Sequence, residues 1–180
     1  LELRDDHPDY PALLIGSELL GGGFLSSRLG ERLRNEEGLA YAVGSSFFAH
    51  PIDRYGTFLA FATYSPQNRE KVMSITREEL AQALEEGFTE EEVERAKSGW
   101  LEQRRTARSE DRQLAGTLSN HLYVDRTMTW ERTLEEEVRA LTPEEIRRAL
   151  AEHLDLDRFV RVTAGDFPAE GEAGAVSGGS

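Results

Sequence analysis

The sequence predicts an α+β fold in which an antiparallel sheet is covered by helices. Residues 39–48 and 55–64 carry the aromatic and apolar patterns of strands, and the short turn between them is typical of a hairpin. Helical segments come in consecutive runs on either side of this hairpin, an order typical of the α+β class. A third strand is expected at residues 158–164. Three strands make a thin sheet with two edges, so we expect further strands from upstream residues or from a partner.

Composition limits the possible functions. The length of 180 residues suits one domain or one half of a larger body. The formal net charge of −13 argues against nucleic acid, which needs a concentrated basic surface, and against simple adhesion to anionic lipid. The absence of cysteine excludes disulfides and thiolate metal sites. No apolar run approaches the ~20 residues that span a bilayer, so no membrane span is expected.

The domain boundaries follow from the two ends of the chain. Residues 1–167 are expected to form a single domain, and the start at Leu1 instead of Met predicts that this domain is incomplete at its N-terminus. Residues 168–180 are dominated by Gly, Ala, Glu and Ser, which predicts a disordered tail.

The chain is expected to open on a strand end and a helix. Residues 1–4 are interpreted as the end of a strand. Aspartates and prolines at positions 6–11 mark the start of a helix that extends to about residue 20. Glycines at residues 21–23 end it, either as a sharp corner or as a ligand-facing loop. The corner is favoured, because no basic residue or P-loop lysine accompanies the glycines.

A second short helix and a strand follow. Ser26 or Ser27 is expected to cap the helix, in which leucines recur along one face at Leu25, Leu29 and Leu33. Arg34 lies about 140° from Leu29 on the helical wheel and therefore off the apolar face. Gly38 is a natural C′ residue. The strand is then expected to place small residues on one face, Ala40, Ala42, Gly44 and Ser46, and larger ones on the other, Leu39, Tyr41, Val43 and Phe47.

The second half of the chain is predicted to be helical up to residue 153. Ser65 and Pro66 are read as the N-cap and first position of a helix that ends at Gly87. A single long helix, continuous or gently kinked, is expected from residue 90 to about residue 123, supported by an apolar stripe. Two further helices are expected at residues 130–141 and 143–153. Capping boxes open two of these helices, at Thr89 with Glu92 and at Thr142 with Glu145.

The long helix also carries a basic stripe: Lys97, Arg104, Arg105, Arg108 and Arg112. These side chains either pair with glutamates and lie along the edge of the core, or they form one wall of a cleft that prefers acidic peptides. Pairing is favoured, because a stripe of charge usually forms a solvated face.

A self-sufficient catalytic centre is not recognisable in the sequence. None of the four histidines belongs to an HExxH or HxxEH motif or to a pair at helical spacing. His121 with Asp125 and His50 with Asp53 are read as local contacts. There is no G-x-S-x-G nucleophile motif and no dinucleotide fingerprint after a strand. A metal site is therefore not expected on this chain.

Arg34 and Tyr41 remain as candidate binding residues. They lie seven positions apart on either side of Gly38, so a helix end and a strand start could bring a guanidinium and a phenol over one groove. Taken on spacing alone, the alternative is stronger: Arg34 would pair with Glu31 or Glu37, and Tyr41 would be an ordinary strand aromatic.

A resemblance changes this balance. The stretch from Leu20-Gly-Gly-Gly through Ser-Ser-Arg-Leu29 to Arg32-Leu-Arg34-x-x-x-Gly38-Leu-Ala-Tyr41 resembles the corresponding segment in non-catalytic halves of pitrilysin-type zinc metallopeptidases. This family includes insulin-degrading enzyme and the mitochondrial processing peptidase. Segments 88–97 and 160–167 are similar to family segments too, so that the resemblance covers roughly residues 1–167.

The resemblance implies a role for both residues. Family members pair two homologous halves around an unfolded peptide, and the other half carries zinc on an HxxEH motif with a distal glutamate. Arg34 would bind a substrate backbone carbonyl, and Tyr41 would donate to the oxyanion of the tetrahedral intermediate. Zinc is thus expected on the partner half and none on this chain.

The expected function is therefore that of a substrate-binding, non-catalytic half of a bacterial two-half zinc metalloendopeptidase. The partners would be an HxxEH-bearing half, fused or separate, and a peptide substrate; self-association is also expected to be possible through exposed sheet edges. The resemblance slightly favours the bacterial periplasm or cell envelope. The alternatives are an inactive, peptidase-like scaffold subunit that only makes protein interfaces, and a peptide-binding module of unrelated ancestry.

Overall fold

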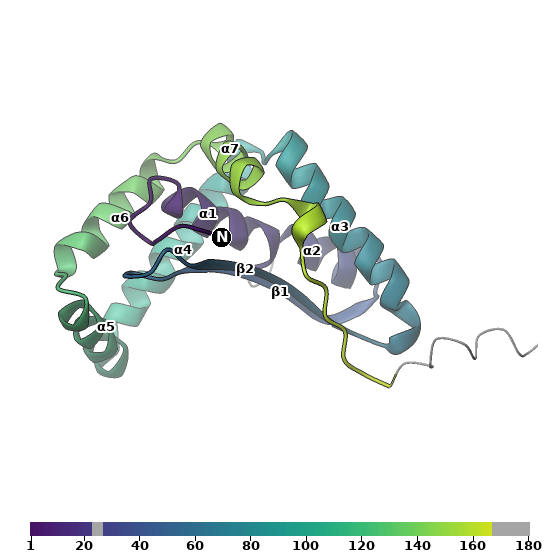
Figure 1. The fold of residues 1–180 in the computed structure, drawn as a ribbon, viewed down its shortest axis with the longest axis horizontal. Helices are drawn as coiled ribbons and strands as arrows, with labels where there is room; N and C mark the ends of the chain where they lie inside the picture. The colour runs from purple at the N-terminus through teal and green to yellow at the C-terminus, as the bar shows by residue number, and fades with distance from the viewer. Residues whose placement is uncertain (23–26, 167–180) are drawn as a thin grey trace, which may run out of the picture.

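The computed structural model describes residues 1–22 and 27–166. Its centre is a bowed antiparallel hairpin with helices arching over one face, as Figure 1 shows. Strand β1 (Ala40–Ala49) pairs with β2 (Gly56–Tyr64), and Phe47 lies opposite Phe58 in the register. The predicted α+β class and the hairpin are confirmed. The predicted disordered tail, residues 168–180, lies outside the described residues.

The third predicted strand is wrong. A 3-10 turn at Leu156–Arg158 is followed by residues 159–166 in extended form, and they belong to no described strand. Phe159 packs its ring against Phe58, but Val160 and Val162 are exposed. Strand-like composition favours an extended backbone, but a segment becomes part of a sheet only where a neighbouring strand supplies hydrogen bonds.

The N-terminal residues meet the turn end of the hairpin. The amino group of Leu1 donates to the carbonyl oxygen of Gly56 at 2.8 Å, and the Gly56 amide donates back to the Leu1 carbonyl at 2.8 Å. Arg4 forms an isolated parallel bridge with His50. The predicted strand end at residues 1–4 is therefore present only as single pairings beside the hairpin.

The helices occupy most of the remaining chain. Two of them begin as α-helix and continue as π-helical turns: α1 (Tyr10–Ser17) extends through Glu18–Gly22, and α2 (Arg28–Gly30) extends through Glu31–Glu36. A 3-10 turn (Pro66–Asn68) leads into α3 (Arg69–Glu86). The others are α4 (Glu90–Ser109), α5 (Asp111–Tyr123), α6 (Met128–Ala140) and α7 (Pro143–His153). No helix in the described ranges combines the length and apolarity needed to cross a bilayer.

The single long helix predicted for residues 90–123 is wrong, because it breaks at Glu110. This residue has an extended backbone with φ −100° and ψ 117°, and α5 starts at Asp111. Ser109 donates its hydroxyl to the Thr106 carbonyl, a back-bond that bends helices. Beyond the break Leu118 and Leu122 are exposed, so the continued stripe had no core to pack against.

The predicted capping boxes are both present, at Thr89 with Glu92 and at Thr142 with Glu145. The other expected caps differ. Asp9 stands at the N-cap of α1 without capping it, and Ser65 makes no cap hydrogen bond, so that the segment after it starts as a 3-10 turn. Both side chains have partners elsewhere, which outcompete a local amide.

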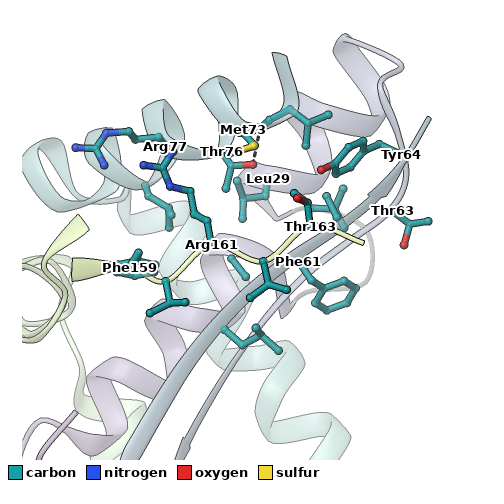
Figure 2. Close-up of a pocket in the computed structure, with 18 of the residues that line it drawn as sticks. Leu29, Phe61, Thr63, Tyr64, Met73, Thr76, Arg77, Phe159, Arg161 and Thr163 are labelled. Atoms are coloured by element: carbon teal, nitrogen blue, oxygen red, sulfur yellow. Dashed lines mark hydrogen bonds between the residues drawn. The ribbon is translucent and has the colours of Figure 1, made fainter. Parts of the chain in front are cut away.

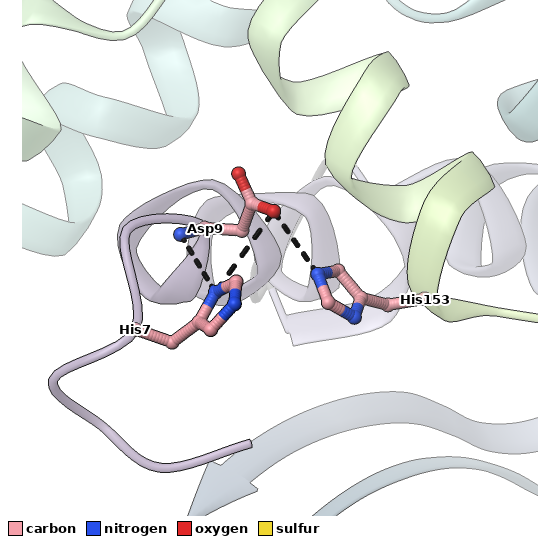
Figure 3. A group of neighbouring side chains, drawn as sticks. All are labelled: His7, Asp9 and His153. Carbon is pink, nitrogen blue, oxygen red and sulfur yellow. Dashed lines mark hydrogen bonds and ion pairs between the residues drawn. The ribbon is translucent and has the colours of Figure 1, made fainter. Parts of the chain in front are cut away.

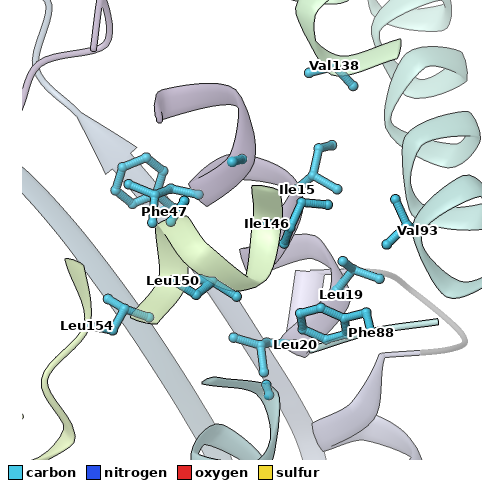
Figure 4. Packing of buried hydrophobic residues seen from close by; sticks show 14 of the residues in the cluster. Ile15, Leu19, Leu20, Phe47, Phe88, Val93, Val138, Ile146, Leu150 and Leu154 are labelled. Atoms are coloured by element: carbon cyan, nitrogen blue, oxygen red, sulfur yellow. The ribbon is translucent and has the colours of Figure 1, made fainter. Parts of the chain in front are cut away.

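Two clusters of buried side chains hold the helices to the hairpin. The larger one joins α1, α4, α6 and α7 to one end of β1 and includes, as Figure 4 shows, Ile15, Phe47, Val93, Val138, Ile146 and Leu150. The smaller one lies at the other end and contains Leu29, Leu33, Ala40, Val72 and Ile75. Gly21 allows the first helix to press on β1, since a Cβ there would stand 2.6 Å from the carbonyl carbon of Gly44. Of the predicted glycine corner, Gly23 lies outside the described residues.

Candidate functional site

The helix that carries Arg34 is fixed at its start. Ser27 accepts the Gly30 amide, which confirms the cap expected at Ser26 or Ser27. The guanidinium of Arg28 donates to both carboxylate oxygens of Glu92, at 3.0 and 3.2 Å, and lies 4.5 Å from the centre of the Phe88 ring. The helix is thereby tied to the first turn of α4.

The Glu92 carboxylate is stabilised as an anion. Burial alone would raise its pKa, but hydrogen bonds from Arg28 and from the amide and hydroxyl of Thr89 outweigh burial and lower the pKa of Glu92 to about 2. One carboxylate therefore completes the capping box and anchors Arg28.

The turn between helix and strand is also well defined. Gly38 has φ +60°, the left-handed conformation expected of a C′ glycine. The Leu39 amide donates to the Leu33 carbonyl at 2.9 Å, and Asn68 donates its side-chain amide to the Leu39 carbonyl at 3.2 Å. With Leu33 fully buried, these bonds fix the direction in which the chain leaves the helix.

Arg34 is exposed at the end of this helix. Its Nε donates to Asn35 Oδ1 at 3.3 Å, and no carboxylate of the described residues pairs with it. The pairing with Glu31 or Glu37 considered from the sequence is not observed, since Asn35 binds Glu31 at 2.6 Å and Lys71 binds Glu37 at 2.6 Å. The hydrogen bond from Lys71 also lowers the pKa of Glu37. The carboxylates nearest in sequence are thus engaged, and the Arg34 fork can take an external acceptor.

Tyr41 is exposed at the start of β1, with 75% of its surface accessible. The predicted placement of Tyr41 on one face with Val43 is wrong, because the register shifts between Ala40 and Ala42. This bulge lets Ala40 and Val43 pack in the same cluster and leaves Tyr41 out of it. The Tyr41 hydroxyl lies 3.2 Å from Ser65 Oγ, and this bond holds the phenol near the start of the 3-10 turn.

Arg34 and Tyr41 thus stand on either side of one ordered turn with both polar ends exposed. No hydrogen bond joins them in the part of the chain that the structure describes. A guanidinium and a phenol are both donors, so the pair suits a ligand that offers two acceptors, such as successive carbonyl oxygens of a peptide.

The basic stripe of α4 forms no comparable site. Lys97 is buried and donates to Glu94 and to the Leu141 carbonyl. Arg104 pairs with Glu131 and stacks on Trp100, and Arg108 pairs with Glu135. Arg105 lies 3.3 Å from Glu102, whereas Arg112, on α5, is exposed and pairs with no described carboxylate. Pairing with glutamates, the reading favoured from the sequence, therefore accounts for every member of the stripe except Arg112.

Of the two local histidine contacts expected from the sequence, the one between His50 and Asp53 is present and the one between His121 and Asp125 is not. His50 accepts the Ile52 and Asp53 amides on Nδ1, as a turn residue does. His121 is instead buried, with Nε2 2.8 Å from Glu131 Oε1, and Asp125 is not its partner. Burial lowers the pKa of His121, helped by the charges of Arg126 and Arg104.

One feature was missed from the sequence: an apolar groove of about 460 Å³ between β2, α3 and the extended residues 159–164. Figure 2 shows Met73 and Thr76 of α3 above Phe61 of β2 and Thr163 of the C-terminal segment, all of which line it. The strand-like composition of residues 158–164 was the only hint of this groove in the sequence. Composition alone does not distinguish a segment that pairs in a sheet from one that lines a groove without pairing.

Comparison with known proteins identifies the family to which the chain belongs. A model described as the peptidase M16 inactive domain matches residues 2–99, more than half of the chain. An uncharacterized zinc protease from Streptomyces coelicolor is 36% identical over 85 residues, which are 47% of this chain and 18% of that protein. The non-peptidase homolog YmxG from Helicobacter pylori is 24% identical over 156 residues, which are 87% of this chain and 35% of that protein. The chain therefore spans about a third or less of these curated relatives.

Solved structures agree in fold. The peptidase M16 inactive domain from Pseudomonas fluorescens superposes with a TM-score of 0.73 at 25% identity, covering 87% of this chain and 37% of that one. An inactive peptidase domain from Bordetella parapertussis gives a TM-score of 0.68 at 20% identity, over 83% of this chain and 79% of that one. The periplasmic protease PqqL from Escherichia coli gives 0.60 at 22% identity, over 79% of this chain and 15% of that one.

Proposed function

Because the chain belongs to the family of peptidase M16 inactive domains, we propose that it is the substrate-binding half of a two-half zinc metalloendopeptidase that cleaves unfolded peptides. Inactive domains of this family pair with a catalytic half, and this agrees with zinc being carried by that half. The observation that carries the proposal is the exposed Arg34 fork, which no described carboxylate neutralises, together with the exposed phenol of Tyr41 on the other side of the Gly38 turn.

Each side chain has a separate task in this proposal. Arg34 donates to a backbone carbonyl of the peptide and sets its register, since a planar fork fixes both position and direction. Tyr41 donates its hydroxyl to the carbonyl oxygen under attack, where negative charge grows in the transition state. The zinc of the HxxEH-bearing half supplies the activated water.

The test is Tyr41→Phe in the complete two-half protein. Loss of one oxyanion donor lowers kcat by about 10²–10³ with little change in KM. Tyr55→Phe is the matched control, because Tyr55 is also an exposed hairpin tyrosine and its hydroxyl bonds only to Thr57 at 2.8 Å. An unchanged kcat for Tyr41→Phe would refute the catalytic role of this phenol.

A second candidate function is an inactive scaffold subunit, favoured by the likeness to a non-peptidase homolog over most of the chain. A scaffold would keep its partners and show no peptidase activity in the complete protein. The sequence of the other half separates the two, because a peptidase requires HxxEH there and a scaffold does not.

The proposal also covers the extent of the domain, how its sheet is completed and the compartment in which it lies. Residues 1–167 would form a single domain whose sheet is completed by further polypeptide, as the unpaired edge of β2 and the exposed Val160 and Val162 suggest. Without that polypeptide, the same exposed edge would favour self-association. The similarity to a periplasmic protease supports the bacterial periplasm or cell envelope as the compartment.

A further inference from the structure

Three potential metal ligands meet where the loop before α1 touches the end of α7. His7 and Asp9 come from the loop and His153 from the last residue of α7, and Figure 3 shows both imidazoles directed at the carboxylate. One ligand atom from each residue lies within 4.8 Å of the other two. The two histidines are far apart in sequence, which is why no motif revealed them.

The carboxylate of Asp9 is divided between two kinds of partner. Oδ1 accepts a hydrogen bond from Arg148 at 2.5 Å. Oδ2 faces the imidazoles, 3.0 Å from His153 Nε2 and 3.9 Å from His7 Nδ1. Burial acts to raise the pKa of Asp9, but Arg148 and His153 outweigh it and lower the pKa, so the carboxylate is held as an anion. Arg148 thus orients the carboxylate, as outer partners of ligating carboxylates do.

The spacing is close to that of a coordinated ion. Ligand atoms ~2.1 Å from one metal stand about 3 to 3.5 Å apart. His153 and Asp9 already have this spacing at 3.0 Å, whereas His7, 3.9 Å from Asp9 Oδ2, needs to move closer. Nδ1 of His7 now accepts the Asp9 amide at 3.1 Å, so this nitrogen is unprotonated and its lone pair is directed at that amide. Metal binding would break that hydrogen bond and displace the proton shared by His153 and Asp9. Because both changes cost free energy, we expect a modest affinity for the metal.

We propose that His7, Asp9 and His153 bind one divalent transition-metal ion, of which Zn²⁺ is the best match for two imidazoles and a carboxylate. His7 is partly exposed and Asp9 is buried, so solvent reaches the site from one side and leaves room for water ligands. The ion fastens the N-terminal loop to α7.

Calorimetric titration of the full chain with Zn²⁺ tests the site. The expected result is one bound ion per chain, with binding weakened at least about tenfold in His7→Ala and in His153→Ala. His50→Ala is the matched control and keeps wild-type binding, because His50 also accepts backbone amides and lies near Asp53 but has no second imidazole. Bound Co²⁺ should show visible absorption that His7→Ala abolishes.

Equal Zn²⁺ affinity in wild type and His7→Ala would overturn the proposal, as would the absence of binding to the folded wild-type chain. His7→Ala is the decisive variant, because this side chain contributes to no core cluster and its loss should leave the fold intact. Mg²⁺ in large excess should not displace Zn²⁺, since imidazole ligands disfavour it.

Discussion

Arginines in two regions of this molecule differ in whether a carboxylate of the fold neutralises their charge. Between α4 and α6, Arg104 and Arg108 are paired with the buried carboxylates Glu131 and Glu135. At the end of α2, Arg34 is exposed and has only an amide oxygen as partner. An arginine that the fold already neutralises contributes to structure, whereas one left without a carboxylate can take an acceptor from a substrate. The difference supports the proposal that Arg34, and not the paired Arg104 or Arg108, binds the substrate.

The largest effect is expected where the charges are buried. Glu135→Ala should lower the free energy of unfolding by about 3 kcal/mol, because Arg108 would remain partly buried without a carboxylate partner. Arg104 would lose one of its two carboxylates and keep Glu131. Chemical denaturation of the purified chain measures the loss.

Glu136 provides the control for that variant. It is the next residue of α6 and is exposed, 3.9 Å from Arg132. Glu136→Ala should change the free energy of unfolding by less than about 0.5 kcal/mol. Equal losses at the two positions would mean that burial does not distinguish the basic stripe from a surface pair.

The ion pair between Glu92 and Arg28, which anchors the helix that carries Arg34, should be lost at acidic pH. The pKa of Glu92 is lowered from 4.5 to about 2 in the folded state, so its contribution is present above pH 4.5 and is lost as the pH falls towards 2. The shift corresponds to about 3 kcal/mol. Glu92→Gln should therefore flatten the decline in stability over this range, whereas Glu90→Gln in the same exposed first turn of α4 should leave it as in wild type. A decline that persists in Glu92→Gln would contradict the role of this anchor.

Local rules predicted the elements well and failed where a distant partner decides. Capping boxes, the hairpin and the Gly38 turn depend on neighbouring residues, and all three are present. Asp9 and Ser65 have cap chemistry but are engaged elsewhere, Asp9 by residues of α7. The exposure of Tyr41 depends on a bulge, which strict alternation cannot anticipate.

The turn between the two candidate binding residues, Arg34 and Tyr41, can be tested by itself. Gly38→Ala should cost about 1–2 kcal/mol, because a Cβ is disfavoured at φ +60° although it would meet no atom within 4 Å. Gly116→Ala in α5 also meets no atom but has no positive φ, and it should stabilise the chain by about 0.5–1 kcal/mol. Thermal unfolding of both variants measures the difference, and equal signs would argue against a strained turn.

The smallest effect on stability is expected at Arg34, and it sharpens the comparison most. Arg34→Gln removes a charge that no described carboxylate pairs with, so the free energy of unfolding should change by less than about 0.5 kcal/mol. Arg108→Gln, which breaks the pair with Glu135, should cost clearly more. In the complete two-half protein the order reverses: Arg34→Gln should raise KM for peptides by about tenfold or more, and Arg108→Gln should not, because only the exposed fork meets the substrate. Peptidase kinetics and unfolding curves on the same two variants decide this, and a KM unaffected by Arg34→Gln would remove Arg34 from the binding site even if its exposure is as described.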